Sequence, residues 1–317
     1  LATAGLKVHV GGAVYPQAGW CGEELLQHAE KALQQARGAG VAGWELHRGS
    51  TEQVHEGRRQ QRLEQAVREG LSSTAFRLQF QARFASASGE VQAMEALLRW
   101  HHPEMGAISP LTFIPLAEEI GLIIELGAWV IEEACRQLAQ WRAQGLTSLT
   151  MSVNLSAYQL RDPGLVQTLA ESLARHHIPP HVLELELTES ALMDGAEANL
   201  RTMHSIRALG VGLSVDDFGT GYSSLNYLNR FPLDKLKIDR SFVHDMLHDP
   251  THRAITQAII GLGHTLDLSV VAEGVETEEE AEALRSARCD ELQGFLYSRP
   301  MPGDALLGWI EARKVIG

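Results

Sequence analysis

Short apolar segments that end in polar side chains recur along the larger, C-terminal part of this chain. The most informative one runs from Leu213 into two adjacent acids, Asp216 and Asp217, and then into a glycine-rich loop that extends to Leu225. An apolar run followed by a glycine-punctuated loop predicts a buried strand that presents its acids at its carboxyl end. In a parallel α/β barrel, that end of each strand belongs to the face that carries the active site.

The same pattern occurs at least five more times. In each case a short apolar segment contains, or directly precedes, one polar residue, namely Glu95, Asn154, Glu186, Lys237 and Glu273. A single acid at such a place is usually a helix cap or half of a loop ion pair, so the repetition carries the argument. In a barrel these side chains would converge on one mouth.

From Phe76 onward, strand and helix patterns alternate. We expect strands near 76–84, 91–99, 149–154, 183–187, 212–216, 235–238, 269–273 and 293–297. We expect helices near 112–120, 123–144, 158–177, 195–209, 251–267, 277–287 and 303–313. Residues 85–90 are too few for a crossover helix, so the first two strands should form an antiparallel hairpin. The predicted fold is α/β, a (β/α)8-like (TIM-type) barrel with an antiparallel first strand, plus a small N-terminal α/β piece.

Composition agrees with this size and limits the partners. The chain has 317 residues, 44% of them hydrophobic, which is enough for one barrel and a small appendage. Its net charge of −13 disfavours binding to a DNA or RNA duplex. Cys21, Cys135 and Cys289 lack metal-ligand spacing and are typical of reduced thiols. We therefore expect a cytoplasmic protein, or the cytoplasmic part of a membrane-anchored one. Because the chain begins at Leu1 rather than at a methionine, upstream regulatory domains stay an open alternative.

The clustered acids predict bound cations. Two carboxylates about 4 Å apart repel by roughly 4 kcal/mol at an effective dielectric near 20, so several cannot share a site without protonation or cations. The candidate ligands all donate oxygen, which suits Mg²⁺ or Mn²⁺ better than Zn²⁺. The acids suffice for two divalent cations, an arrangement suited to phosphodiester displacement, and Lys237 would orient water or neutralise phosphate.

The ordered motifs resemble those of one family. They are Glu95-Ala96-Leu97, Asn154-Leu155-Ser156, Glu186-Leu187-Thr188-Glu189, Asp216-Asp217-Phe218-Gly219, Lys237-Ile238-Asp239, Glu273-Gly274-Val275-Glu276 and Gln293-Gly294. By these motifs, roughly residues 70–315 are identified as a member of the EAL domain family of cyclic di-GMP phosphodiesterases. The resemblance implies hydrolysis of cyclic di-GMP to linear pGpG by a homodimer.

The resemblance also implies a role for each matching residue. The first metal would be held by Glu95, Asn154, Glu186 and Asp216, and the second by Asp217 and Glu273, with Asp216 shared. The catalytic residues would be Lys237, Glu273 and Glu95. The substrate contacts would be Gln81, Arg99, Glu276 and Gln293. Glu189 would steady the loop 216–225, which in the family couples dimer contacts to metal binding.

One departure from the family pattern falls after the first strand. Where relatives usually have Gln-Pro, this chain has Gln81-Ala82, followed by Arg83. Loss of proline removes a backbone restraint. We therefore expect Gln81 to be held less firmly.

The N-terminal part of the chain is different in kind. Residues 6–15, 22–37 and 43–48 predict a strand, a helix and a strand, and they resemble the closing third of a GGDEF (diguanylate cyclase) domain. The family's signature sequence is absent, so we expect no cyclase activity. The predicted organisation is a partial GGDEF-like segment over 1–50, a connecting helix over 51–71 and the EAL barrel over 72–317.

Two alternatives to the phosphodiesterase stay open. One is a catalytically silent cyclic di-GMP receptor that signals to a partner protein, although such relatives typically lack some of the metal ligands that are present here. The other disregards the resemblance and proposes a Mg²⁺-dependent barrel enzyme that enolises carboxylates with Lys237 as its base.

Overall fold

The structure, a computed structural model, describes residues 8–15, 22–38, 43–47, 51–71, 73, 75–220 and 225–316. The chain divides into two compact units, Leu1–Ser72 and Ser73–Gly317. In the first, strands β1 (His9–Ala13) and β2 (Gly43–His47) pair in parallel. The unit also holds helices α1 (Gly22–Gly38) and α2 (Thr51–Leu71). Gly11 lies so close to α1 that an added Cβ would come within 2.2 Å of the Leu33 backbone nitrogen.

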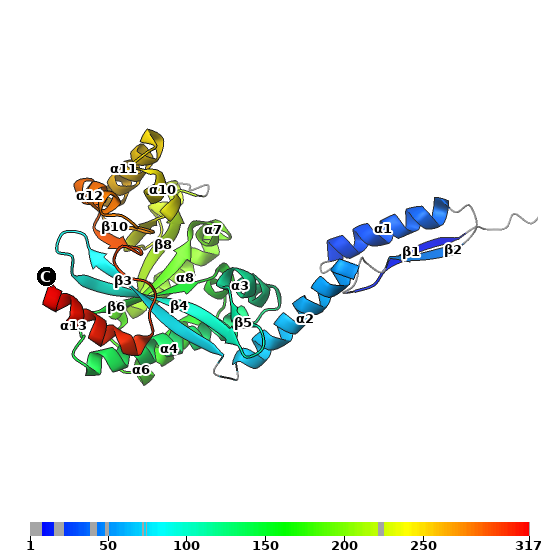
Figure 1. Cartoon of the computed structure of the whole chain (residues 1–317), viewed down its shortest axis with the longest axis horizontal. Helices are drawn as coiled ribbons and strands as arrows, with labels where there is room; N and C mark the ends of the chain where they lie inside the picture. Colours follow the sequence, from blue (N-terminus) through cyan, green and yellow to red (C-terminus); the bar gives the residue numbers. More distant parts are fainter. Residues whose placement is uncertain are drawn as a thin grey trace, which may run out of the picture. The chain divides into compact units, whose positions relative to one another are not determined.

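The second unit is a closed barrel of eight strands (Figure 1). Its strands are β3 (Phe76–Ala85), β4 (Val91–His102), β6 (Thr150–Leu155), β7 (Leu183–Thr188), β8 (Gly212–Phe218), β9 (Lys235–Ile238), β10 (Ser269–Ala272) and β11 (Glu291–Gln293). Strand β3 pairs antiparallel with both β4 and β11, whereas all other neighbours in the barrel are parallel. The predicted fold class, with its antiparallel first strand, is confirmed. A short strand outside the barrel, β5 (Gly106–Ile108), pairs antiparallel with the last residues of β4.

Alternation along the strands stacks polar side chains in two layers inside the barrel. Successive side chains point to opposite faces, so residues two apart in one strand lie on the same face at different heights. Glu184 lies two residues before Glu186 in β7, and Lys235 lies two residues before Lys237 in β9. All four side chains are largely withdrawn from solvent. The barrel therefore has a second polar layer nearer the amino ends of its parallel strands.

Most of the predicted helices are present around the strands (Figure 1). The longer ones are α3 (Pro110–Glu119), α4 (Ile123–Ala143), α6 (Leu165–Arg175), α8 (Ala196–Leu209), α11 (Pro250–Thr265), α12 (Glu278–Ser286) and α13 (Leu306–Ile316). The single helix expected over 158–177 is split into α5 (Ala157–Leu160) and α6. The break falls at Asp162-Pro163-Gly164, where proline and glycine oppose a continuous helix. The sequence patterns also missed α7 (Glu189–Met193), α9 (Leu225–Leu228) and α10 (Arg240–Asp245), which are too short for an apolar face to repeat along the helix.

The last strand was placed too late in the sequence. The prediction was 293–297, but β11 ends at Gln293. At Gly294 an added Cβ would come within 2.0 Å of the Val275 carbonyl oxygen, and the Ser298 N–H bonds back to the Gly294 carbonyl. Because the chain makes a close contact and a turn there, the apolar residues after Gly294 do not continue the strand.

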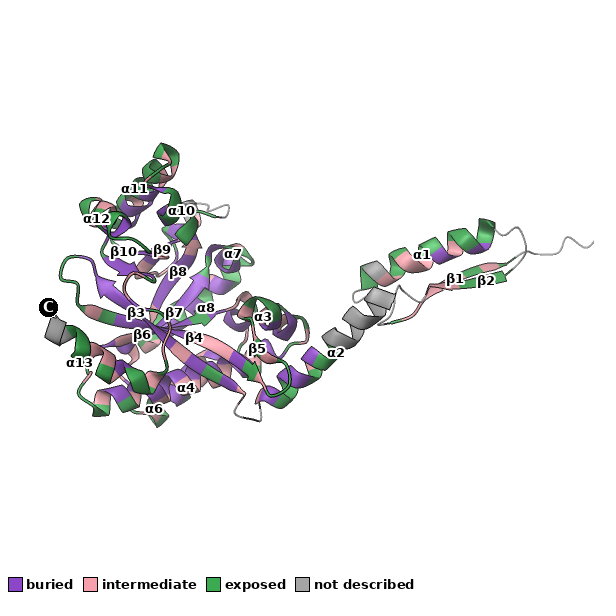
Figure 2. Ribbon diagram, viewed as in Figure 1, coloured by how far each residue is buried: buried purple, intermediate pink, exposed green. Residues whose placement is uncertain are grey.

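The barrel strands are predominantly buried (Figure 2). One hydrophobic core surrounds them, and it includes Leu185, Leu213, Leu236 and Val270. Cys135 and Cys289 are buried free thiols, and burial raises the pKa of each to about 12, while Cys21 lies outside the described residues. Within the part of the chain that is described, no helix combines the length and apolar character that a membrane span requires.

Candidate active site

Five charged side chains converge inside the barrel, and we call them the rim cluster: Glu95, Glu186, Asp216, Lys237 and Glu273. Lys237 lies at their centre and is fully buried. Its Nζ lies 2.6 Å from Glu186 Oε2 and 3.3 Å from Asp216 Oδ1, and it also contacts Glu273 Oε1. Acids from β7, β8 and the end of β10 therefore meet at one point, as the repeated strand pattern predicts.

Glu95 is held from two sides. Its Oε1 accepts a hydrogen bond of 2.8 Å from Asn154 Nδ2, and its Oε2 accepts one of 2.5 Å from Gln293 Nε2. Gln293 also lies 3.5 Å from Gln81 Oε1. The structure thus joins two predicted metal ligands, Glu95 and Asn154, with two predicted substrate contacts.

The rim cluster contains more negative charge than Lys237 can balance. Burial and the carboxylates of Glu95 and Asp216 raise the pKa of Glu186 to about 8, although Lys237 opposes this shift. Burial and the same neighbours raise the pKa of Glu273 well above its usual value. Burial would lower the pKa of Lys237, but the surrounding acids outweigh it and raise that pKa. An additional cation would relieve this repulsion.

Asp217 has an unusual backbone. Its φ is +54°, in the left-handed region that residues other than glycine rarely adopt, and the pairing of β8 with β9 is interrupted between Val215 and Phe218. The Asp217 N–H donates to Asp216 Oδ1 over 2.9 Å. Burial and the neighbouring negative charges of Asp216 and Asp239 raise the pKa of Asp217 to about 6. The irregular backbone therefore holds the Asp217 carboxylate within range of the charges of Asp216 and Asp239.

The loop after these acids is anchored by Glu189. The Gly219 N–H donates to Glu189 Oε2 over 3.0 Å, and Gly219 has a φ of +99° that favours glycine. Glu189 is itself buried. Residues 221–224 of the predicted loop lie outside the described part of the chain.

The donor chemistry of the site fits hard divalent cations. The predicted ligands offer carboxylate and amide oxygens and carry excess negative charge. As the side chains stand, no group of three or more His, Cys, Asp and Glu residues within the described ranges is arranged to hold a metal ion. The ammonium of Lys237 joins Glu186, Asp216 and Glu273 at the centre of the cluster.

Comparison with known proteins agrees with these features. The family model described as "EAL domain" matches residues 63–300. This chain belongs to the EAL domain family. It is 43% identical over 302 residues to the bifunctional diguanylate cyclase/cyclic di-GMP phosphodiesterase MucR of Pseudomonas aeruginosa, covering 95% of this chain and 44% of that protein. It is 40% identical over 309 residues to the cyclic di-GMP phosphodiesterase NbdA of the same species, covering 98% of this chain and 39% of that protein.

A solved structure is similar over the EAL domain. The complex of the MucR phosphodiesterase with c-di-GMP has a TM-score of 0.75 and 47% identity, covering 77% of this chain and 99% of that one. This chain spans less than half the length of the two curated relatives.

The Gln-Ala departure within this EAL domain has a local compensation. The Ala82 N–H, which proline would lack, donates to Ser298 Oγ over 3.0 Å, and Gln81 Nε2 donates to the Ser298 carbonyl over 3.0 Å. One position before Gln81, Phe80 exchanges two backbone hydrogen bonds with Met301, of 2.7 and 2.9 Å. Ser298 thus holds both the Gln81 side chain and the next backbone N–H at the place where proline would restrain the backbone.

The described hydrogen bonds of the other two predicted substrate contacts go to residues outside the rim cluster, although Arg99 lies within reach of the Glu95 charge. Arg99 Nε donates to Gln79 Oε1 over 3.0 Å, and Arg99 Nη1 donates to the Leu98 carbonyl. Glu276 follows β10 with an exposed side chain, and its N–H donates to Glu280 Oε2. The structure therefore links Gln293 to Glu95 and Gln81 to Gln293 by hydrogen bonds, whereas Arg99 on β4 and Glu276 after β10 make no such bond to the cluster among the described residues.

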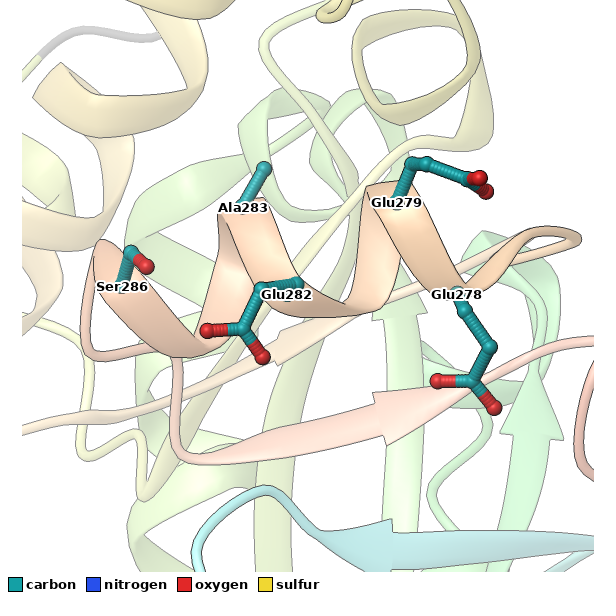
Figure 3. A pocket seen from close by; sticks show the side chains of 5 residues that line it. All are labelled: Glu278, Glu279, Glu282, Ala283 and Ser286. Atoms are coloured by element: carbon teal, nitrogen blue, oxygen red, sulfur yellow. The ribbon is translucent and has the colours of Figure 1, made fainter.

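A surface pocket lies elsewhere on the EAL domain, along α12 (Figure 3). All of its lining residues belong to that helix: Glu278, Glu279, Glu282, Ala283 and Ser286. Arg285 forms ion pairs with Glu278 and Glu282. None of the predicted site residues lines this pocket, so we regard it as an acidic helix surface.

Sequence patterns gave no role to two residues that touch the site. Asp239 follows β9 and adds its charge to the surroundings of Asp217, and it fits the apolar-strand-then-acid pattern that identified the others. Arg83 stood out only as unusual, yet its side chain is 1% exposed inside the barrel. A buried arginine on a strand that runs opposite to the others falls outside any rule based on strand ends.

Proposed function

We propose that this chain is a divalent-metal-dependent phosphodiesterase that hydrolyses cyclic di-GMP to linear pGpG. The supporting observation is the rim cluster, in which buried acids on several strands surround one lysine and exceed its charge. Membership of the EAL family, and relatives named as cyclic di-GMP phosphodiesterases, supply the substrate class.

The residues divide into two ligand sets. Glu95, Asn154, Glu186 and Asp216 would hold one cation, and Asp217 and Glu273 a second, with Asp216 shared. Bound Mg²⁺ or Mn²⁺ would lower the pKa of a water molecule and stabilise charge on the phosphate oxygens.

The remaining side chains position and balance charge. Lys237 holds three acids in fixed orientations and places a positive charge beside the phosphate. Glu273 is partly accessible and is suited to take up the proton of the attacking water. Gln293 Oε1 is buried and has no hydrogen-bond partner among the described residues, so it offers an acceptor to the substrate. Gln81 lies beside it as a second amide contact, while Arg99 and Glu276 would contact outer parts of the nucleotide.

We also propose how the rest of the chain is organised. Residues 72–317 would act as the phosphodiesterase unit in a homodimer, with 51–71 as a connecting helix and 1–50 as a partial GGDEF-like segment. The division between Ser72 and Ser73 supports the position of the boundary, while the family match over 63–300 begins within the connecting helix.

The decisive experiment is an assay of nucleotide turnover. The purified chain, incubated with cyclic di-GMP and Mg²⁺ or Mn²⁺, should yield pGpG by liquid chromatography, and chelation with EDTA should abolish the product. Glu95→Ala should remove turnover. Binding of cyclic di-GMP without any pGpG, under every metal condition, would favour the silent receptor and reject the enzyme.

A further inference from the structure

Beneath the rim cluster, four charged side chains form a closed ring, which we call the basal ring: Arg83, Glu184, Lys235 and Glu291. Arg83 Nη1 and Nη2 lie 3.1 and 3.2 Å from the two oxygens of Glu184. Lys235 Nζ lies 3.2 Å from Glu184 Oε2 and 2.7 Å from Glu291 Oε1. Arg83 Nε lies 2.5 Å from Glu291 Oε2 and completes the circuit as an ion pair that lacks hydrogen-bond geometry.

The basal ring balances its own charge. It contains two cations and two anions, and each side chain contacts both neighbours of opposite sign. Burial would raise the pKa of Glu184, but the charges of Arg83 and Lys235 outweigh it and lower that pKa to about 2. The ring therefore needs no further ion.

One side chain links this balanced layer to the rim cluster. Arg83 Nη1 also lies 3.4 Å from Glu186 Oε1, while Lys237 Nζ takes the other oxygen at 2.6 Å. Both oxygens of Glu186 are thereby oriented, one from below and one from the side. A guanidinium can make these contacts together because its five N–H donors are fixed in one plane, whereas a lysine ammonium cannot span them.

We propose that Arg83 is a positioning residue that orients the carboxylate of Glu186 for metal binding, and that its two hydrogen bonds to Glu184 hold Arg83 in place. This inference rests on the proposed function, because it takes Glu186 as a metal ligand. Groups that orient metal ligands from behind typically change metal affinity or activity by about 10- to 100-fold when they are altered. The alternative is that Arg83 only neutralises Glu184 and Glu291 and has no effect on the metal.

Two matched double variants separate these possibilities. Arg83→Met with Glu184→Gln removes one cation and one anion of the ring and abolishes the contact with Glu186. Lys235→Met with Glu291→Gln makes the same charge change in the other half of the ring and leaves Arg83 on Glu184 and Glu186. Thermal unfolding shows whether each variant is folded, and titration calorimetry gives its dissociation constant for Mn²⁺.

We expect the first variant to bind Mn²⁺ about tenfold or more weakly than the parent chain, and the second to stay within about threefold. Equal Mn²⁺ affinity in the two variants would overturn the proposal. If the first variant does not fold, the Mn²⁺ affinity of Arg83→Lys decides between the two possibilities, because this variant keeps the positive charge and loses the planar guanidinium. Weaker Mn²⁺ binding by Arg83→Lys supports the proposal, and unchanged binding refutes it.

The parent chain provides the separate test of the function on which this inference rests. If the parent neither binds Mn²⁺ nor hydrolyses cyclic di-GMP, the proposed function fails. If the parent does both and the first double variant binds Mn²⁺ equally well, only the role of Arg83 fails.

Discussion

The basal ring and the rim cluster lie in the same barrel interior but differ in charge balance. Both consist of buried charged side chains on neighbouring strands, one layer apart. In the basal ring two cations meet two anions, and the pKa of Glu184 falls to about 2 despite burial. In the rim cluster a single lysine faces several acids, and the pKa of Glu186 rises to about 8 because burial and like charges dominate. The contrast separates buried acids that are matched by cations from buried acids that are not, and the proposed metal ligands belong to the second group.

The largest expected effect is on turnover after neutralising a rim acid. Asp216→Asn should lower kcat on the order of 1,000-fold, equivalent to about 4 kcal/mol, because bound cations would lose a shared carboxylate. The variant should unfold at or above the parent's temperature, since it relieves repulsion. Steady-state kinetics with Mn²⁺ and thermal unfolding measure both. If Asp216→Asn keeps the parental kcat, turnover does not require this rim acid. The charge difference between the two clusters would then carry no information about function.

A basal substitution should act first on stability. Glu291→Gln leaves Arg83 and Lys235 short of negative charge, so we expect the free energy of unfolding to fall by about 3 kcal/mol. Urea denaturation measures this loss. A Glu291→Gln variant as stable as the parent would show that the ring's charge balance contributes nothing to the fold.

Divalent cations should stabilise the protein through the rim cluster alone. At a Mn²⁺ concentration 100 times the dissociation constant, the gain is about 2.7 kcal/mol, seen as a higher Tm. Glu291→Gln should retain this gain, and Asp216→Asn should lose most of it. If Mn²⁺ raises the Tm of both variants equally, the ions bind outside the rim cluster.

The smallest effect concerns Asp217 and depends on pH. Its pKa of about 6 lies above the usual value of 3.8, so its ionisation destabilises the metal-free fold increasingly as pH rises between these values. Asp217→Asn keeps a residue that tolerates the left-handed backbone. At pH 7 it should gain about 1 kcal/mol after allowance for solvent screening, and the gain should vanish below about pH 4. Urea denaturation in EDTA across this range tests it, and a gain independent of pH would contradict the assignment.

Much of the barrel and its rim could be predicted because alternation and strand ends are local properties of the sequence. The acids of β7, β8 and β10 meet at Lys237 because parallel strands share one carboxyl end. The tie between Ala82 and Ser298 joins residues 216 positions apart and leaves no local signal. Arg83 was missed because β3 runs in reverse, so a residue later in that strand lies deeper in the barrel. The end of β11 was missed because a close approach of Gly294 to the Val275 backbone overrides strand propensity.

The antiparallel pairing of β3 with β11 is also the seam at which the barrel closes. Arg83 lies on one side of that seam and Glu291 on the other, far apart along the chain. Joining such distant segments carries a loop-closure cost that short-range pairings avoid. We therefore expect β3 and β11 to pair late in folding. The ion pair between Arg83 and Glu291, which balances charge in the folded barrel, therefore forms only when the last strand docks against the first.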